Sequence, residues 1–168
     1  MSTMNVLICQ QPKELVWKQR EIPIPGDNEA LIKIKSVGIC GTDIHAWGGN
    51  QPFFSYPRVL GHEICGEIVG LGKNIADLKN GQQVAVIPYV ACQQCPACKS
   101  GRTNCCEKIS VIGVHQDGGF SEYLSVPVAN ILPADGIDPQ AAALIEPFAI
   151  SAHAVRRAAI APGEQVLV

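Results

Sequence analysis

Residues 30–45 read ALIKIKSVGICGTDIH and join an apolar run to a cluster of reactive side chains. The first half, Ala30 to Val37, is rich in Ile and Val and has the composition of a β-strand. The second half, residues 38–45, places a thiol, a hydroxyl and an imidazole within one or two turns, directly after that strand. Connecting segments commonly carry functional groups, so this stretch predicts a β-rich protein with a functional site where a strand ends.

Similar Val- and Ile-rich runs recur between Gly, Pro, Asn and Asp residues, which form turns and end strands. The expected strands are Asn5 to Cys9, Leu15 to Ile22, Ala30 to Val37, Ile64 to Leu71 and Gln83 to Ile87. The sequence Asp-Gly-Gly at 117–119 predicts a hairpin that leads into a further strand over residues 120–126. The first two thirds of the chain are therefore expected to form a closed or sandwiched sheet.

The character of the sequence changes after Asp138. Residues 141–160 (AAALIEPFAISAHAVRRAAI) are rich in helix formers, with Asp138 as the expected N-cap and Pro139 at the first helical position. Two helices are expected to meet near Pro147, and the segment APGEQVLV predicts a turn followed by the start of an apolar strand over residues 165–168. The expected fold class is mostly β with a few helices (α+β).

Composition excludes several classes of function. A chain of 168 residues with 47% hydrophobic content can bury the core of one ordinary domain. Its net charge of -2 argues against a surface that binds nucleic acid, so a small-molecule partner is expected. The sequence has no signal-peptide pattern and no run of roughly 18 apolar residues, which predicts a cytoplasmic protein without a membrane span.

Cysteine spacing predicts a metal site, because disulfides are rare in the cytosol. Four of the eight cysteines lie within fifteen polar-rich residues at x2, x2 and x7 spacings: Cys92, Cys95, Cys98 and Cys106. Four thiolates can surround one tetrahedral zinc and leave no open position, which predicts a structural role. Bacterial iron–sulfur clusters also use two x2 spacings, but their fourth cysteine follows after x3, so the x7 gap favours zinc. Cys105 is an adjacent competitor for the fourth position.

Four motifs together resemble the zinc-containing medium-chain dehydrogenases, and among them the sorbitol, threonine and sugar-acid branch. The motifs are GICGTDIH at 38–45, GHE at 61–63, the cysteine motif and LIEP at 144–147, and the resemblance runs from about residue 6 to residue 168. It implies a GroES-like β-barrel catalytic domain over residues 1–145. It also implies that residues 146–168 form a linking helix and the first strand of a nicotinamide-binding Rossmann domain. The sequence contains no G-x-G-x-x-G motif, so we expect a fragment that ends at the domain junction.

The resemblance also implies a catalytic zinc site. It makes Cys40 and His62 direct zinc ligands, and it puts Glu63 and Glu146 in the remaining protein ligand positions, with water exchanging against one of them. Whether the two carboxylates bind the metal together, alternately or through water stays open.

Further roles follow from the same resemblance. Thr42 and His45 resemble the proton relay of the family, and Cys106 rather than Cys105 completes the structural zinc site. The implied activity is oxidation of a secondary alcohol in a polyol or a sugar acid, such as L-galactonate, with hydride transfer to NAD(P). The expected cofactors are two zinc ions per chain and NAD(P) bound by the missing domain. The fragment alone is expected to be inactive, and the full-length protein to be a homo-oligomer, either a dimer or a tetramer.

The loop GGNQPFFSYPR at 48–58 is expected to line the substrate pocket. Phe53, Phe54 and Tyr56 would form its walls, and Arg58 could attract a substrate carboxylate or phosphate, although a solvent-facing Arg is the commoner case.

Two other functions compete with the dehydrogenase. A non-catalytic zinc-knuckle module that binds a partner or nucleic acid is disfavoured by the acidic balance of the chain. A quinone-reductase-like relative without zinc is disfavoured because both sets of candidate metal ligands are present.

Overall fold

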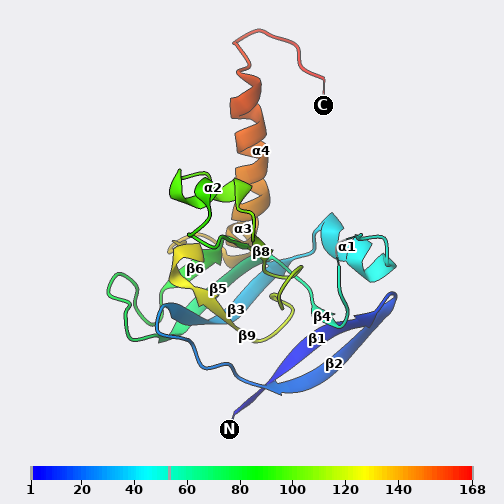
Figure 1. Cartoon of the computed structure of the whole chain (residues 1–168), viewed down its shortest axis with the longest axis vertical. Helices are drawn as coiled ribbons and strands as arrows, with labels where there is room; N and C mark the ends of the chain where they lie inside the picture. Colours follow the sequence, from blue (N-terminus) through cyan, green and yellow to red (C-terminus); the bar gives the residue numbers. More distant parts are fainter. Residues whose placement is uncertain (1, 53, 168) are drawn as a thin grey trace.

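The computed structural model describes residues 2–52 and 54–167 (Figure 1). The strands are β1 (Thr3–Gln11), β2 (Glu14–Glu21), β3 (Glu29–Gly38), β4 (Arg58–Val59), β5 (Glu63–Leu71), β6 (Gln83–Val86), β7 (Tyr89–Val90), β8 (Ser110–Val111), β9 (Tyr123–Pro127) and β10 (Ile131–Pro133). The helices are α1 (Gly41–Gly48), α2 (Pro96–Lys99), α3 (Pro139–Ala143) and α4 (Ile145–Ala158), with 3-10 turns η1 (Thr103–Cys105) and η2 (Val128–Asn130). The predicted fold class, mostly β with a few helices, is confirmed.

The main sheet has five antiparallel strands in the order β10-β6-β5-β3-β9. Its core is built from β-branched residues that the strands present to one another, including Ile32 on β3, Ile64 and Ile68 on β5 and Val84 on β6. All four are at most 1% exposed, and each such side chain contributes roughly 1.5–3 kcal/mol when fully buried. This rigid sheet supports the segments that follow β3 and precede β5.

A second sheet has the order β2-β1-β4 and forms a long hairpin at one side of the molecule (Figure 1). Met4, Val6 and Ile8 alternate along β1 and pack with Val59 of β4 in a second core cluster. An isolated bridge joins Val6 to Ser121, so the hairpin is attached to the segment that leads into β9.

The five predicted strands before residue 90 are all confirmed, with ends that differ by one or two residues. The strand expected over residues 120–126 begins later, at Tyr123, because Gly118, Gly119 and Phe120 instead bond to the carbonyl groups of residues 59–61. Residues 165–167 form no strand, since no other strand among the described residues pairs with them; Val168 lies outside the described residues.

The helices at the end of the chain begin where the sequence predicts, but the junction between them lies at a different residue. Asp138 caps α3 by accepting hydrogen bonds from the backbone N–H groups of Gln140 and Ala141, with Pro139 at the first position, as predicted. The junction between α3 and α4 lies at Leu144 and not near Pro147, so that expectation is wrong. Proline is tolerated there because N–H groups in the first turn of a helix have no partner within it. Figure 1 shows α4 projecting away from both sheets.

Among the described residues, no helix combines the length and the apolar character that crossing a bilayer requires.

Candidate metal centre

Cys40, His62 and Glu63 converge at one edge of the main sheet. One ligand atom from each residue can be chosen so that all three lie within 4.8 Å of one another. Cys40 is the N-cap of α1, whereas His62 and Glu63 are buried at the start of β5. A thiolate, an imidazole and a carboxylate are the donor types that zinc takes in proteins. The three residues therefore fit a zinc ion with one position left for another ligand.

The pairing of β3 with β5 brings these residues together. The register places Gly38, the last residue of β3, opposite Glu63. A Cβ atom on Gly38 would lie 1.9 Å from the Glu63 Oε2 atom, so only glycine leaves room for this carboxylate. Because Cys40 follows Gly38 by two residues and His62 precedes Glu63, the same pairing delivers all three candidate ligands.

A fourth residue, Asp43, joins the two halves of the site. Its Oδ2 atom accepts a hydrogen bond from the Cys40 N–H at 2.9 Å, and its Oδ1 atom accepts one from the Gly61 N–H at 3.0 Å. Oδ1 also lies 3.9 Å from Nδ1 of His62, a buried nitrogen with no hydrogen-bond partner in the described chain. A carboxylate beside the second nitrogen of an imidazole is the usual support of a metal-bound histidine. Asp43 thus caps α1 and places its carboxylate beside the imidazole of His62.

Glu146 lies outside the group of three. Its Oε1 atom accepts a hydrogen bond of 2.5 Å from the hydroxyl of Tyr89. Burial raises the pKa of Tyr89, and the Glu146 bond and charge and the Cys40 thiolate raise it further. The charge of Cys40 acts on the phenol that binds Glu146, so Tyr89 lies within electrostatic range of the cluster, whereas the Glu146 carboxylate is not one of its members.

The four cysteines of the second motif also converge, with Sγ atoms all within 4.8 Å of one another: Cys92, Cys95, Cys98 and Cys106. The Cys92 and Cys98 sulfurs are 4.0 Å apart. Two sulfurs bound tetrahedrally to one zinc at about 2.3 Å would be separated by about 3.8 Å, so the spacing fits a single zinc. Cys105 is exposed and does not belong to the group.

Backbone N–H groups stabilise negative charge on the sulfurs of this knuckle. Cys106 Sγ accepts from the N–H groups of Cys92 at 3.3 Å and Lys108 at 3.4 Å, and Cys92 Sγ accepts from Cys95 at 3.4 Å. Hydrogen bonds from Gln94 and Cys95 lower the pKa of the Cys92 thiol to about 6. Metal ligation requires deprotonated thiols, so these bonds favour zinc binding.

Comparison with known proteins identifies the family of the domain that carries both sites. Residues 26–136 match the model of the alcohol dehydrogenase GroES-like domain. This chain belongs to that family. The GroES-like fold that the resemblance implied is confirmed, and the family includes zinc-type, NAD(P)-dependent alcohol and polyol dehydrogenases.

Relatives of this GroES-like domain come from several bacteria. The crystal structure of the alcohol dehydrogenase RspB from Escherichia coli CFT073 with NADH is 40% identical, with a TM-score of 0.86, and the match covers 94% of this chain and 46% of that one. The structure of galactitol-1-phosphate dehydrogenase from Escherichia coli is 33% identical, with a TM-score of 0.87, over 93% of this chain and 45% of that one. An L-threonine 3-dehydrogenase from Chelativorans sp. is 34% identical over 98% of this chain and 49% of its own length. The chain thus spans about half the length of these relatives.

The expected relay residues of the GroES-like domain both lie on α1. The Thr42 hydroxyl is 3.7 Å from the Cys40 sulfur, so it borders the metal cluster. His45 is exposed and lies three residues further along the helix. The structure gives no direct hydrogen bond between these two side chains.

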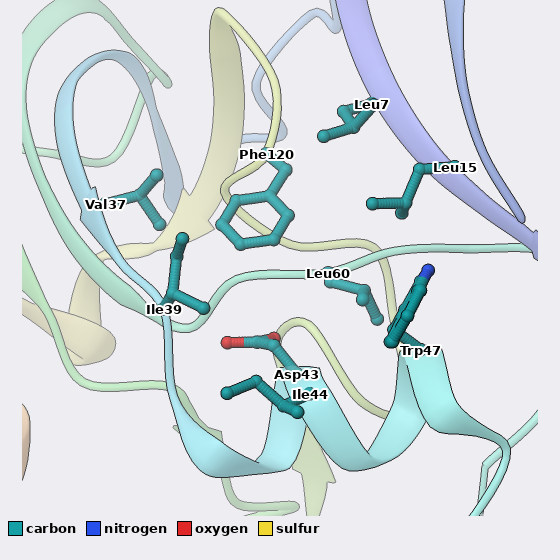
Figure 2. Close-up of a pocket in the computed structure, with 9 residues that line it drawn as sticks. All are labelled: Leu7, Leu15, Val37, Ile39, Asp43, Ile44, Trp47, Leu60 and Phe120. Atoms are coloured by element: carbon teal, nitrogen blue, oxygen red, sulfur yellow. The ribbon is translucent and has the colours of Figure 1, made fainter. Parts of the chain in front are cut away.

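A cavity of about 320 Å³ lies beside this site, between the β1–β2 hairpin and α1. Figure 2 shows its lining residues. Among the described lining residues the Asp43 carboxylate is the one charged group; the others are Leu7, Leu15, Val37, Ile39, Ile44, Trp47, Leu60 and Phe120. A second cavity of about 400 Å³, lined in part by Tyr89 and Glu146, lies between β6, β7 and α4.

The loop expected to line a substrate pocket is used for packing in this domain. Phe54 and Tyr56 stack edge to face and pack against a buried core cluster. The Arg58 guanidinium pairs with Asp117 at 3.4 Å, a carboxylate that it shares with Arg20 at 2.6 Å, so it already has a partner within the protein. Phe53, the third expected wall, lies outside the described residues.

Two residues that contribute to the site were missed from the sequence. Asp43 was not proposed as a site residue, although its position three residues after Cys40 is the spacing of a helix capping box. Tyr89 carries no local signal, because its link to Glu146 spans 57 residues of sequence.

Proposed function

We propose that this chain is the catalytic half of a zinc-dependent dehydrogenase that oxidises a secondary alcohol of a polyol or a sugar acid, such as L-galactonate, and transfers hydride to NAD(P). The convergence of Cys40, His62 and Glu63 carries the proposal, because three ligands leave a position for a substrate oxygen. A purely structural knuckle would need only the four cysteines and would have no reason to build the second cluster.

The chemistry has two parts, loss of a proton from the alcohol oxygen and loss of a hydride from its carbon. A zinc ion held by Cys40, His62 and Glu63 would supply Lewis-acid polarisation of the substrate oxygen. In our proposal the Thr42 hydroxyl relays the proton from that oxygen, and His45 releases it to solvent. The exposure of His45 suits this last step, since an imidazole exchanges protons with water near neutral pH.

In our proposal the nicotinamide ring of the cofactor accepts the hydride. We assign cofactor binding to a part of the protein outside these 168 residues. The NADH bound to the RspB relative supports this assignment, as does its length of about twice this chain. We place the division between the catalytic domain and the linking segment near residue 145, where α4 leaves the body of the fold. The isolated chain would then bind zinc at both sites without catalysing hydride transfer.

The substrate class rests on the relatives and on the identity of residue 146. Two of the relatives are named for threonine and for galactitol 1-phosphate, and both of these are polar molecules that carry hydroxyl groups. The resemblance aligns Glu146 with the position at which the classical alcohol dehydrogenases have a second cysteine. A glutamate at this position agrees with the polyol branch. A screen of polyols, amino alcohols and sugar acids against the longer protein that carries this domain tests the class.

The metal assignment is tested on that longer protein with matched variants. Cys40→Ser should remove one zinc and abolish turnover, whereas Cys105→Ser should change neither. His45→Ala should retain both zincs and alter the pH dependence of turnover. Normal turnover by Cys40→Ser would remove the proposed catalytic metal, and an unchanged pH profile for His45→Ala would remove the relay role.

A further inference from the structure

Tyr89 and Glu146 come from different parts of the chain and meet at the cavity between β6, β7 and α4. The 2.5 Å bond between the phenol and the carboxylate is short, as expected for a hydroxyl bonded to a charged oxygen, where such bonds are about 2.5–2.7 Å long. An ionised carboxylate only accepts hydrogen bonds, so the Tyr89 hydroxyl is the donor.

The backbone that carries Tyr89 is fixed from two sides. Tyr89 pairs with Val111 in the β7–β8 ladder. The buried side chain of Asn130 donates hydrogen bonds to the carbonyl groups of Ile87 at 2.7 Å and Tyr89 at 3.1 Å. The backbone position of Tyr89 is therefore set by the sheet and by Asn130.

The Glu146 side chain has more conformational freedom than the backbone that carries Tyr89. It lies in the first turn of α4, where the helix dipole favours a carboxylate, and its side chain has three rotatable bonds. It lines the cavity between β6, β7 and α4, so it has space to move. The Glu146 oxygen that accepts the hydrogen bond of the phenol cannot at the same time be optimally placed as a metal ligand.

We infer that Tyr89 is a positioning residue that holds the Glu146 carboxylate away from a metal bound by Cys40, His62 and Glu63. The inference rests on the proposed function. In the structure, Glu146 takes the phenol-bound arrangement and is absent from the cluster of ligand atoms within 4.8 Å. Holding this carboxylate back keeps the fourth position of the metal open for a substrate oxygen or water. Removing the hydroxyl frees Glu146 to enter the metal site.

Cobalt substitution tests this without any catalytic readout. The 168-residue chain is loaded with zinc in the knuckle and with Co²⁺ at the second site, and cobalt affinity and visible absorption are measured. Tyr89→Phe should bind Co²⁺ about tenfold more tightly, because a freed charged ligand replaces a hydrogen bond. Its visible absorption bands should also shift, since a carboxylate would replace water as the fourth ligand of the cobalt.

A double-mutant cycle identifies the route of the effect. In a Glu146→Gln background, adding Tyr89→Phe should change neither cobalt affinity nor absorption. Tyr123→Phe, which removes a hydroxyl from a residue of the hairpin core, is the matched control and should behave as the wild type.

The outcomes separate the inference from the proposed function. Wild-type chain that binds one metal, at the knuckle alone, overturns both. Two metals with no effect of Tyr89→Phe, or with the same effect when Glu146 is Gln, overturns only the positioning role of Tyr89. Retention of the knuckle zinc by each variant verifies that it has folded.

Discussion

Gly38 and Glu63 face each other across the β3–β5 pairing, and the space that a side chain on Gly38 would need is filled by the Glu63 carboxylate. This contact explains how one residue type in a strand shapes a metal site. The glycine is needed for a close approach and not for an unusual backbone conformation, since its φ angle is not in the left-handed region.

Gly38→Ala should therefore displace Glu63 and lower the zinc content from two ions per chain to one. Gly41→Ala is the matched control, because a Cβ atom there meets no other atom within 4 Å. Zinc per folded chain, measured after gel filtration, compares them. Two zinc ions in Gly38→Ala would show that Glu63 is not needed as a ligand.

Asp43→Asn should weaken metal binding at the cluster about 10- to 100-fold, the usual effect of losing a carboxylate that supports a metal-bound histidine. The substitution keeps the size of the side chain but removes its charge beside His62. Competition with a metal-binding dye measures the affinity. Asp117→Asn, which alters a carboxylate bonded to Arg58 and the Val59 N–H, should leave it unchanged. Equal affinities for Asp43→Asn and the wild type would assign Asp43 to capping alone.

Cys106→Ser should lose the knuckle zinc and Cys105→Ser should retain it. The two residues are neighbours, but only the Cys106 sulfur is buried within the group of four. Mass spectrometry under native conditions counts the bound metal directly. The opposite pattern would mean that the segment around η1 rearranges when it binds zinc.

Thiol alkylation should follow burial in the zinc-loaded protein. Burial raises the pKa values of Cys9 and Cys65 above the ordinary value of 9.0, so their reactive thiolate forms become common only at higher pH. At pH 8, iodoacetamide should modify exposed Cys105 faster than Cys9 and Cys65, because burial both raises the pKa of these two thiols and shields them from the reagent. Peptide mapping over time measures the order, and rapid labelling of Cys65 would contradict the buried environment.

Much of the fold could be predicted because the strands carry their own signal. Ile and Val runs bounded by turn residues gave the positions of β1, β2, β3, β5 and β6. The short strands β4, β7, β8 and β10 were missed, since two or three residues are too few to show a pattern and their pairing depends on partners distant in sequence.

Part of the candidate site could likewise be predicted from local motifs, and part of it could not. Cys40 and His62 could be proposed because they lie in distinctive local motifs. The choice between Glu63 and Glu146 could not be made, because it depends on the β3–β5 register and on the Tyr89 bond to Glu146. Arg58 was expected to attract a substrate, and nothing near it in sequence indicates that Asp117 would pair with it.

A crystal structure of the zinc-loaded chain, with anomalous diffraction recorded at the zinc absorption edge, tests the central claim most directly. We expect two peaks of similar height, one among the four knuckle sulfurs and one among Cys40, His62 and Glu63. A single peak at the knuckle, with the second cluster empty at saturating zinc, would contradict the account.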